Sequence, residues 1–416
     1  MSAETATIER LGLQGDGIVS SPSGPVFVPF TLPGERVTLA VNKQQGTVMS
    51  LLAPSPDRVA PACRHFGPEG ENGTCGGCTL QHAGDDLYHA FKRQIVIDAL
   101  RSRGIETEVA PLVIARPGER RRTVFTARRT EKDLLLGYNQ AESHHIVSIT
   151  ECPIASPGIV SRLAAIRIIA AALAANAEPF RITVLETTTG LDLAAEGIKA
   201  LSDRHRQQAI EAVLKLRGIA RLAVNGETIV EPLKPLITFD GIAVSPPPGG
   251  FAQASAVAEA AMAELVMTHL GKAKRIADLF AGTGTFALRM ARKGRVHAVE
   301  SEEKALKALD LAARNTQGLK PVSIEKRDLF RRPMMTSELK VYDAVVFDPP
   351  RAGAEAQCRE LVRSTVKTIV AVSCNPQTLA RDLSILIEGG YRVTKVTPVD
   401  QFLWSSHVEA VATLTR

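Results

Sequence analysis

Hydrophobic and polar positions follow three different patterns along the chain. Between residues 6 and 52, short alternating runs are separated by turn residues, as in Val26-Phe27-Val28-Pro29 and Leu32-Pro33-Gly34-Glu35. Alternation with a period of two is typical of β-strands, and short strands between Gly- and Pro-rich turns indicate a small barrel. We therefore expect residues 1–53 to form a five-stranded, OB-like β-barrel, an architecture that often binds oligonucleotides.

Residues 54–245 mix several patterns. The segment is at first rich in Pro, Gly and Cys, and it becomes helical at about Asp85. Strand-like runs follow, interrupted by an Ala-rich helical stretch at 156–178 and a charged one at 201–217. We see no catalytic motif in these strands and helices, so we expect a central α+β scaffold.

Residues 246–416 begin with a stiff and then flexible break, Pro246-Pro247-Pro248-Gly249-Gly250. After it, apolar runs alternate with helical patterns. This alternation predicts a doubly wound α/β domain with a largely parallel, Rossmann-like sheet. The fold class we expect is therefore a multidomain α/β protein, with the barrel first and the Rossmann-like domain last.

Composition limits the possible classes of protein. The chain has 416 residues, of which 45% are hydrophobic, enough for two or three buried cores. No apolar run reaches the ~20 residues that cross a bilayer, and the first residues lack the pattern of a signal peptide. We expect a cytoplasmic protein without a membrane partner. Nothing indicates an obligate protein partner, so we expect a monomer.

The net charge of +6 mildly favours a polyanionic partner. Its distribution is more informative, because basic residues gather in a segment that alternates like a strand. A solvated basic face would explain this pattern, but arginines presented from a sheet also suit contact with RNA, and we expect that contact. The residues are Arg116, Arg120, Arg121, Arg122, Arg128, Arg129 and Lys132.

A glycine turn predicts a cofactor site in the last domain. The apolar strand 275–280 is followed by Gly282-Thr283-Gly284 and then by a helix from Phe286. Such a turn lets a ligand approach the backbone at the carboxyl end of the sheet. The turn alone would also fit a dinucleotide, but Phe286 stands near the place of that fingerprint's third glycine.

Acidic residues end the neighbouring strands. Glu300 can hold both hydroxyls of a ribose, Asp328 can accept from an adenine amino group, and Asp348 begins Asp-Pro-Pro. This ordered set of strand-end residues resembles that of class I SAM-dependent methyltransferases. The resemblance implies S-adenosyl-L-methionine (SAM) as the cofactor.

Cys374 follows the next apolar strand, at the same edge of the sheet. A thiolate that adds to carbon 6 of uracil makes carbon 5 electron-rich enough to attack a methyl sulfonium, after which a base must remove the proton on carbon 5. Because the thiolate must form near neutral pH, we expect a polar or positive setting. The alternative is a buried core cysteine. A nitrogen methyltransferase using Asp-Pro-Pro, in which Cys374 is dispensable, also stays open.

The base should be a carboxylate or a histidine close to Cys374. His407 and Glu409 lie near the end of the chain, between two predicted strands. Being two residues apart, they would face the same side of a strand. A surface salt bridge is the simpler explanation of either residue.

Three motifs in the last domain resemble those of one enzyme family. They are Ser-Cys-Asn-Pro-x-Thr-x-x-Arg-Asp at 373–382, Asp-x-Phe followed by His-Val-Glu at 400–409, and Phe-x-Gln at 251–253. These motifs are similar to those of the RNA uracil-5 methyltransferases, the TrmA, RlmC and RlmD family. The resemblance implies that Cys374 is the nucleophile and Glu409 the base.

The resemblance also implies where the cofactor binds. The chain departs from the family at Ser255 and Thr285, where Asn is common, and at Leu403, where Pro is usual. Cytosine-5 enzymes need a second cysteine where this chain has Arg351, which disfavours cytosine. The implied cofactor residues are Gln253, Phe280, Gly282, Gly284, Thr285, Glu300, Asp328 and Asp348.

Four of the six cysteines suggest a metal site. Cys63, Cys75, Cys78 and Cys152 can supply four thiolates, which suit either zinc or an iron–sulfur cluster. The run Cys-Gly-Gly-Cys-Thr-Leu-Gln-His at 75–82 resembles the [4Fe–4S] motif of the RlmC and RlmD branch, which implies a structural cluster. The gap after Cys63 is long for that branch, so Cys63 is the ligand most open to question.

The substrate follows from the combination of parts. Residues 1–53 resemble the TRAM module of RNA-modifying enzymes, and a TRAM module together with the cluster motif resembles the RlmD branch. This implies large-subunit 23S rRNA as the substrate, with tRNA as the alternative. A different class, an RNA-binding or ribosome-assembly factor with an inactive methyltransferase fold, also stays open.

Overall fold

The computed structural model describes residues 3–141, 143–199 and 201–416. The N-terminal strands form one sheet in the order β1-β5-β6-β4-β3-β2. We expected five strands, and six are assigned because the first strand breaks near Ile8. Its first half pairs with β5 and its second half with β3, so the sheet curls round on itself. The strands are β1 (Ala3–Thr7), β2 (Arg10–Leu11), β3 (Gly17–Ser21), β4 (Gly24–Val28), β5 (Arg36–Asn42) and β6 (Gln45–Ala53).

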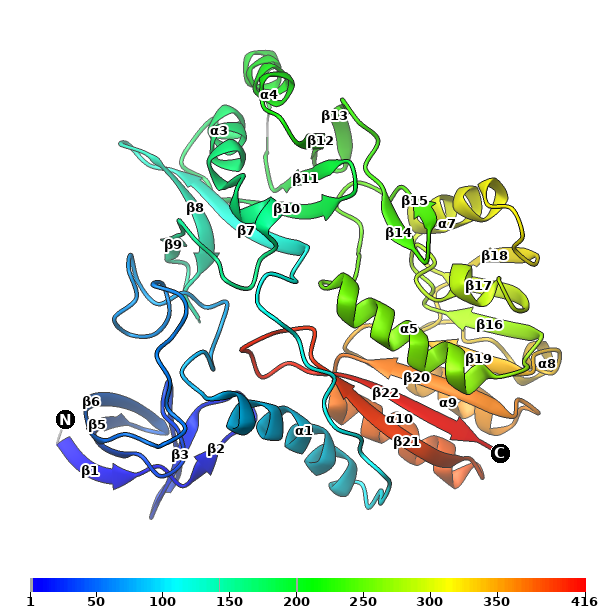
Figure 1. The fold of residues 1–416 in the computed structure, drawn as a ribbon, viewed down its shortest axis with the longest axis horizontal. Helices are drawn as coiled ribbons and strands as arrows, with labels where there is room; N and C mark the ends of the chain where they lie inside the picture. The colour runs from blue at the N-terminus through cyan, green and yellow to red at the C-terminus, as the bar shows by residue number, and fades with distance from the viewer. Residues whose placement is uncertain (1–2, 142, 200) are drawn as a thin grey trace.

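The middle of the chain forms a seven-stranded sheet in the order β13-β12-β11-β10-β7-β8-β9, over which α3 and α4 pack against each other (Figure 1). The helices lie within the two stretches that the sequence predicts, and Ser202 caps α4. The elements are β7 (Arg122–Arg129), β8 (Leu134–Asn139), β9 (Ile146–Ser148), α2 (Pro157–Val160), α3 (Leu163–Leu173), β10 (Phe180–Thr187), β11 (Gly190–Glu196), α4 (Asp203–Lys215), β12 (Ile219–Val224) and β13 (Glu227–Val230).

Helix α1 (Asp85–Arg101) begins at the predicted residue but belongs with the end of the chain. It packs on α10 and β21, and its residues Ile95, Val96 and Ala99 share one hydrophobic core with the C-terminal sheet. The chain then runs beside β21, where Val109 bridges Val396 in parallel. Residues 85–113 are therefore part of the C-terminal unit, although the central sheet follows them in sequence.

The C-terminal sheet has the order β18-β17-β16-β19-β20-β22-β21. Strands β16 to β20 are parallel, and β22 is antiparallel to both of its neighbours. The strands are β16 (Arg275–Leu279), β17 (Arg295–Glu300), β18 (Val322–Lys326), β19 (Ala344–Phe347), β20 (Thr368–Ser373), β21 (Arg392–Val399) and β22 (Glu409–Thr415). A hairpin of β14 (Ile237–Phe239) and β15 (Ile242–Val244) precedes the sheet.

The helices that alternate with these strands along the chain pack against the sheet (Figure 1). Ser255, one of the departures from the family pattern, caps α5 by accepting from the backbone N–H of Ala258. Across the described ranges, no helix is long and apolar enough to cross a membrane. The helices are α5 (Ala256–Leu270), α6 (Ala287–Met290), α7 (Glu303–Asn315), α8 (Thr336–Leu339), α9 (Glu355–Val362) and α10 (Pro376–Glu388).

Candidate active site

The predicted nucleophile and base meet at one edge of the C-terminal sheet. Cys374 follows the parallel strand β20, whereas Glu409 begins the antiparallel strand β22. The two strands are neighbours, and Ser373 is paired with Ala410. This register places Cys374 and Glu409 side by side at the edge where β16, β17 and β19 also end.

The two glycines of the turn after β16 have different surroundings. At Gly282, with a φ of +53°, an added Cβ would meet nothing within 4 Å, so the backbone there is open to a ligand. At Gly284, with a φ of +97°, an added Cβ would lie 2.9 Å from Cγ of Leu309. Thr285 follows the turn. Gly282 therefore leaves room for a cofactor, whereas Gly284 is needed for packing on α7.

The acidic side chains beside this turn are held by backbone N–H groups. Glu300 accepts from Gly282 N at 3.0 Å, and Asp328 accepts from Phe330 N at 3.0 Å. The ring of Phe330 lies 5.4 Å from that of Phe280, centroid to centroid. The sequence did not single out Phe330, although its position two residues after Asp328 was a usable signal.

Buried side-chain amides connect the predicted cofactor residues to the candidate base, Glu409. Gln253 Nε2 donates to Asp348 Oδ2 at 3.0 Å. Gln401 Nε2 donates to Gln253 Oε1 at 2.8 Å and to Glu409 Oε1 at 3.0 Å. The side-chain oxygen of Gln401 is buried without a hydrogen-bond partner. The sequence motif contained Gln401 only as its variable position, so its role was missed.

Burial raises the pKa values of the site's acids. Burial, followed by the neighbouring Asp348, raises the pKa of Glu409 to about 8. Burial also raises the pKa of Asp348 to about 7. Burial, then Glu409 and Asp348, raise the pKa of the half-buried Cys374 to about 11. The expected positive setting is therefore limited to Arg351, whose charge lowers the pKa of Cys374 against these effects.

Arg351 links the loops that surround Cys374. Its carbonyl oxygen accepts from Asn375 Nδ2 at 3.3 Å and from Thr378 Oγ1 at 3.2 Å. Its guanidinium lies 3.1 Å from the ring nitrogens of His407. His407 precedes β22, so the expectation that it faces the same side of a strand as Glu409 is wrong. His407 is exposed, whereas Glu409 is buried.

A loop at residues 400–408 leads to Glu409 and is anchored by helix α1. Lys92 Nζ donates to Asp400 Oδ1 at 3.0 Å, to Phe402 O and to His407 O. The hydroxyl of Tyr88 donates to Asp400 Oδ2 at 2.7 Å. The side chains of Lys92 and Asp400 are fully buried. The loop that delivers the candidate base therefore depends on a buried ion pair with a distant helix.

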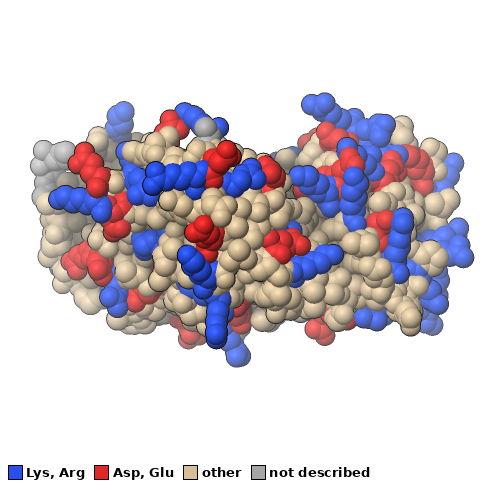
Figure 2. Space-filling model, turned by 90° about the horizontal axis from the view of Figure 1, so that it is seen from above, with Lys and Arg blue, Asp and Glu red and all other residues tan. Residues whose placement is uncertain are grey.

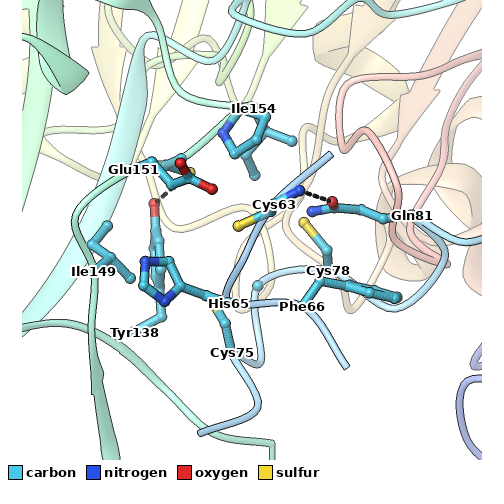
Figure 3. A pocket seen from close by; sticks show the side chains of 13 residues that line it. Cys63, His65, Phe66, Cys75, Cys78, Gln81, Tyr138, Ile149, Glu151 and Ile154 are labelled. Atoms are coloured by element: carbon cyan, nitrogen blue, oxygen red, sulfur yellow. Dashed lines mark hydrogen bonds between the residues drawn. The ribbon is translucent and has the colours of Figure 1, made fainter. Parts of the chain in front are cut away.

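The four predicted ligand cysteines line one cavity (Figure 3). None is in a disulfide, and Tyr138 OH lies 3.8 Å from Cys152 Sγ. The charges of the other three thiolates raise the pKa of Cys78, after burial, which shows that the sulfurs are near one another. Within the part of the chain that is described, no three His, Cys, Asp or Glu residues are grouped closely enough for a single metal ion. The cysteines that line this cavity are Cys63, Cys75, Cys78 and Cys152.

Comparisons with known proteins agree on the class of enzyme. A sequence model of the family described as tRNA (Uracil-5-)-methyltransferase matches residues 173–416. An RNA methyltransferase of Rhizobium meliloti is 72% identical over 416 residues, covering 100% of both chains. The 23S rRNA (uracil(1939)-C(5))-methyltransferase RlmD of Chromohalobacter salexigens is 30% identical and covers 100% of this chain and 90% of its own.

A solved structure has the same fold over almost the whole chain. It is the tRNA (uracil-54, C5)-methyltransferase of Pyrococcus abyssi in complex with S-adenosyl-L-homocysteine. The TM-score is 0.75, with 24% sequence identity, and the match covers 99% of both chains. The arrangement of a barrel, a central sheet and a C-terminal sheet is therefore shared with a tRNA enzyme.

Proposed function

The chain belongs to the family of SAM-dependent RNA (uracil-C5)-methyltransferases, and on that premise we propose that it methylates one uridine of large-subunit 23S rRNA through a covalent bond to Cys374. The observation that supports this mechanism most directly is the strand register that places Cys374 beside Glu409. The nucleophile acts on carbon 6 and the base on carbon 5 of the same uracil ring. Both side chains must therefore lie at the same edge of the sheet.

Cys374 is the proposed nucleophile. Its thiol loses a proton to water at the half-exposed pocket, and its sulfur adds to carbon 6 of the uracil. The electron pair of the 5,6 double bond then moves toward carbon 5 and the carbonyl oxygen at position 4. Because burial, and then the nearby carboxyl groups of Glu409 and Asp348, raise the pKa of the thiol to about 11, we expect this proton to leave only when substrate and cofactor are bound.

Glu409 is the proposed base. Once carbon 5 has gained the methyl group, the Glu409 carboxylate removes the remaining proton on that carbon, and the bond between Cys374 and carbon 6 breaks. Burial and Asp348 bring the pKa of Glu409 to about 8, near the pH at which a general base is most effective. Gln401 holds the carboxylate in place through its amide.

The described residues fit the cofactor that the family uses. Gly282 leaves open space, and both carboxylate oxygens of the buried Asp278 at the end of β16 lack a partner. When bound, SAM supplies an electrophilic methyl group. We propose that Glu300 and Asp328 hold the nucleoside part and that Gln253 and Asp348 face the methionine part. We propose that Phe280 and Thr285 complete the wall of this site, and that Gly284 serves it indirectly, by letting the turn pack against α7.

The choice of rRNA rests on sequence rather than on fold. The RlmD relative with which this chain aligns from end to end acts on 23S rRNA by its name. The tRNA enzyme shares the whole arrangement of domains at lower identity, so the barrel alone does not distinguish the two substrates. We propose that the barrel at residues 1–53 is an RNA-binding TRAM module in either case.

We propose that the cysteine cavity holds a [4Fe–4S] cluster. Zinc would need all four sulfurs at about 2.3 Å from one centre, and no such group is found among the residues described. Four free thiols around one cavity suit the larger cluster better. The chemistry at Cys374 needs no electron transfer, so the cluster's role is structural.

Trapping of the covalent intermediate tests the mechanism. RNA containing 5-fluorouridine, incubated with SAM, should give a denaturant-stable protein–RNA adduct, because fluorine cannot leave as a proton. C374A should give no adduct. E409Q should retain it even with ordinary uridine, because the proton on carbon 5 stays in place. An adduct with C374A, or none with the wild-type protein, would overturn the mechanism.

Two further measurements address the alternatives. Transcripts of 23S rRNA and of tRNA, digested after reaction and analysed for 5-methyluridine by mass spectrometry, separate the two substrates. Tight RNA binding without methylation of either transcript would instead indicate an assembly factor with an inactive methyltransferase fold.

A further inference from the structure

In the basic segment that the sequence singled out, some arginines have partners within the protein and others do not. Arg121 forms an ion pair with Glu259 at 2.7 Å and also donates to the carbonyl oxygen of Gln253. Arg128 and Arg129 donate to backbone carbonyls of the α3–β10 connection. All three guanidinium groups therefore have partners within the protein, and that of Arg121 is bound on two sides.

Arg120 and Arg122 are different. Neither forms an ion pair within the described residues, and the Nε atom of each is buried without a hydrogen-bond partner. The carboxylate of Glu196 lies near Arg122 but is paired with Arg181 at 3.3 Å. Burial, followed by the charge of Arg120, lowers the pKa of Arg122, so the two cations repel each other. Two unpaired guanidinium groups held close together form a site for an anion.

The backbone explains why these two side chains act together. The chain is extended here, with Arg120 paired to Ala155 and Ser255 and with β7 starting at Arg122. Residues 120 and 122 therefore face one side and Arg121 the other. Each guanidinium lies over an aromatic ring, Arg120 at 5.6 Å from the centroid of Phe402 and Arg122 at 5.8 Å from that of Phe251.

The Arg120 side of this anion site adjoins the pocket of Cys374. Arg120 lines a cavity together with Phe402, and the residues Gln14, Ser406 and His407 line both this cavity and the one that contains Cys374. Gln14 belongs to the barrel, so three parts of the molecule border the same opening. On the face seen in Figure 2, by contrast, Lys and Arg side chains are interspersed with Asp and Glu.

We propose that Arg120 and Arg122 bind the phosphodiester groups on either side of the target uridine. This inference rests on the proposed function, because it assumes that a uridine in RNA occupies the pocket of Cys374. Guanidinium groups bind phosphate oxygens through paired hydrogen bonds. The rings of Phe402 and Phe251 keep the two arginine side chains extended toward the RNA. The only other anion expected nearby is the carboxylate of SAM, which the test must separate.

Neutral RNA linkages provide the test. Oligonucleotide substrates are made with a single methylphosphonate at each position around the target uridine, and kcat/KM for methylation is measured. For the wild-type protein, kcat/KM should fall about 10- to 100-fold when a contacted linkage is neutral. R120Q and R122Q should show a similar loss with normal RNA and little further loss with the neutral linkage.

R314Q is the matched control. Arg314 is 75% exposed at the end of α7, at the opposite edge of the sheet from Cys374, and its loss removes the same charge. The slope of log kcat/KM against log salt should become shallower by about 0.7 for each lost phosphate contact, in R120Q and R122Q but not in R314Q. Thermal unfolding and SAM titration show whether each variant is folded.

Distinct outcomes overturn the proposal. If every linkage tolerates neutralisation, or if R120Q and R122Q stay as sensitive as the wild type, the arginines do not bind the flanking phosphates. If the variants weaken SAM binding and leave RNA dependence unchanged, the anion is the SAM carboxylate. If no RNA is methylated by the wild-type protein, the proposed function itself has failed, which is a separate result.

Discussion

Gln401 donates both to Gln253 and to Glu409, so two amides connect Asp348 on the cofactor side with the candidate base. All of these polar groups meet at the ends of three strands. A single side chain in such a chain affects both the position and the protonation of its neighbours. A change at Gln401, which is not itself a reacting group, should therefore alter the position and protonation of Glu409.

Replacing Gln401 by leucine should change the pH dependence of the reaction. The amide of Gln401 lowers the pKa of Glu409, which burial raises to about 8. Without the amide the pKa rises further, so the carboxylate form becomes scarcer at neutral pH. A rise of one unit would lower kcat about tenfold at pH 7 and move the acidic limb of the kcat profile to higher pH. An unchanged profile with normal SAM affinity would show that Gln401 does not act on Glu409.

The two glycines of the turn after β16 should respond differently to alanine. In G284A the new methyl group would lie 2.9 Å from Leu309 Cγ, so the free energy of unfolding should fall by about 1–3 kcal/mol. In G282A the methyl group meets no protein atom, so stability should fall by only about 1 kcal/mol from the positive φ, while SAM affinity falls more. Urea unfolding and SAM titration measure the two effects, and the same loss of SAM affinity in both variants would contradict this division.

At the scale of elements, the loop at residues 400–408 joins parts that lie far apart in sequence. Helix α1 holds it through Lys92 and Tyr88, and the backbone N–H groups of Thr79 and Leu80 both donate to Trp404 O. The loop is thus fixed by the segment between the barrel and the central sheet. The position of Glu409 depends on these contacts rather than on the C-terminal sheet alone.

Breaking the buried ion pair should destabilise the C-terminal unit strongly. In K92M, Asp400 remains buried without its cation, a loss of about 3–5 kcal/mol. The double variant K92M/D400L should recover part of this stability, because no uncompensated charge is left. Chemical denaturation of the four proteins, as a double-mutant cycle, measures the coupling. A loss in the double variant that equals the sum of the losses in K92M and D400L would show that the pair itself contributes little.

The sequence predicts much of the candidate site because its residues stand at the ends of apolar strands. Cys374, Glu300 and Asp348 each follow a run that identifies its own strand, so their meeting at one sheet edge was foreseeable. The contact of Gln401 with Gln253 and the docking of α1 join side chains that are more than a hundred residues apart in the chain. The break in the first barrel strand also depends on pairing beyond its own sequence, because β1 pairs with β5 and β2 pairs with β3. Local patterns do not specify such pairings.

At the scale of the whole molecule, the barrel, the cysteine segment and the C-terminal sheet meet around one opening. Leu32 of the barrel packs with Leu80 and with Leu403 of the loop. Cys78 precedes Thr79, whose N–H donates to Trp404 O. The proposed cluster is therefore connected to the loop that leads to Glu409 without taking part in the chemistry.

Loss of the cluster should impair RNA methylation and spare cofactor binding. C78S, or removal of iron by chelation, should lower kcat/KM for RNA by about 10- to 100-fold, as supporting contacts around a site commonly do. SAM affinity should stay equal to that of the wild-type protein, since Gly282 and Glu300 lie on the C-terminal sheet. Iron and sulfide analysis, visible absorbance and SAM titration test this. A colourless wild-type protein loaded with zinc would refute the cluster.

The antiparallel strand β22 lies between β20 and β21, although it follows both in the chain. While the protein is being synthesised, β20 and β21 cannot pair with each other, because β22 must later lie between them. The apolar face of α1 also remains uncovered until α10 and β21 have been made. Glu409 is the first residue of β22, so the proposed nucleophile and base cannot come together in the sheet until this strand has left the ribosome. Catalytic competence should therefore arise only once β22 has paired with β20, and chains that stop before Glu409 should depend on chaperones.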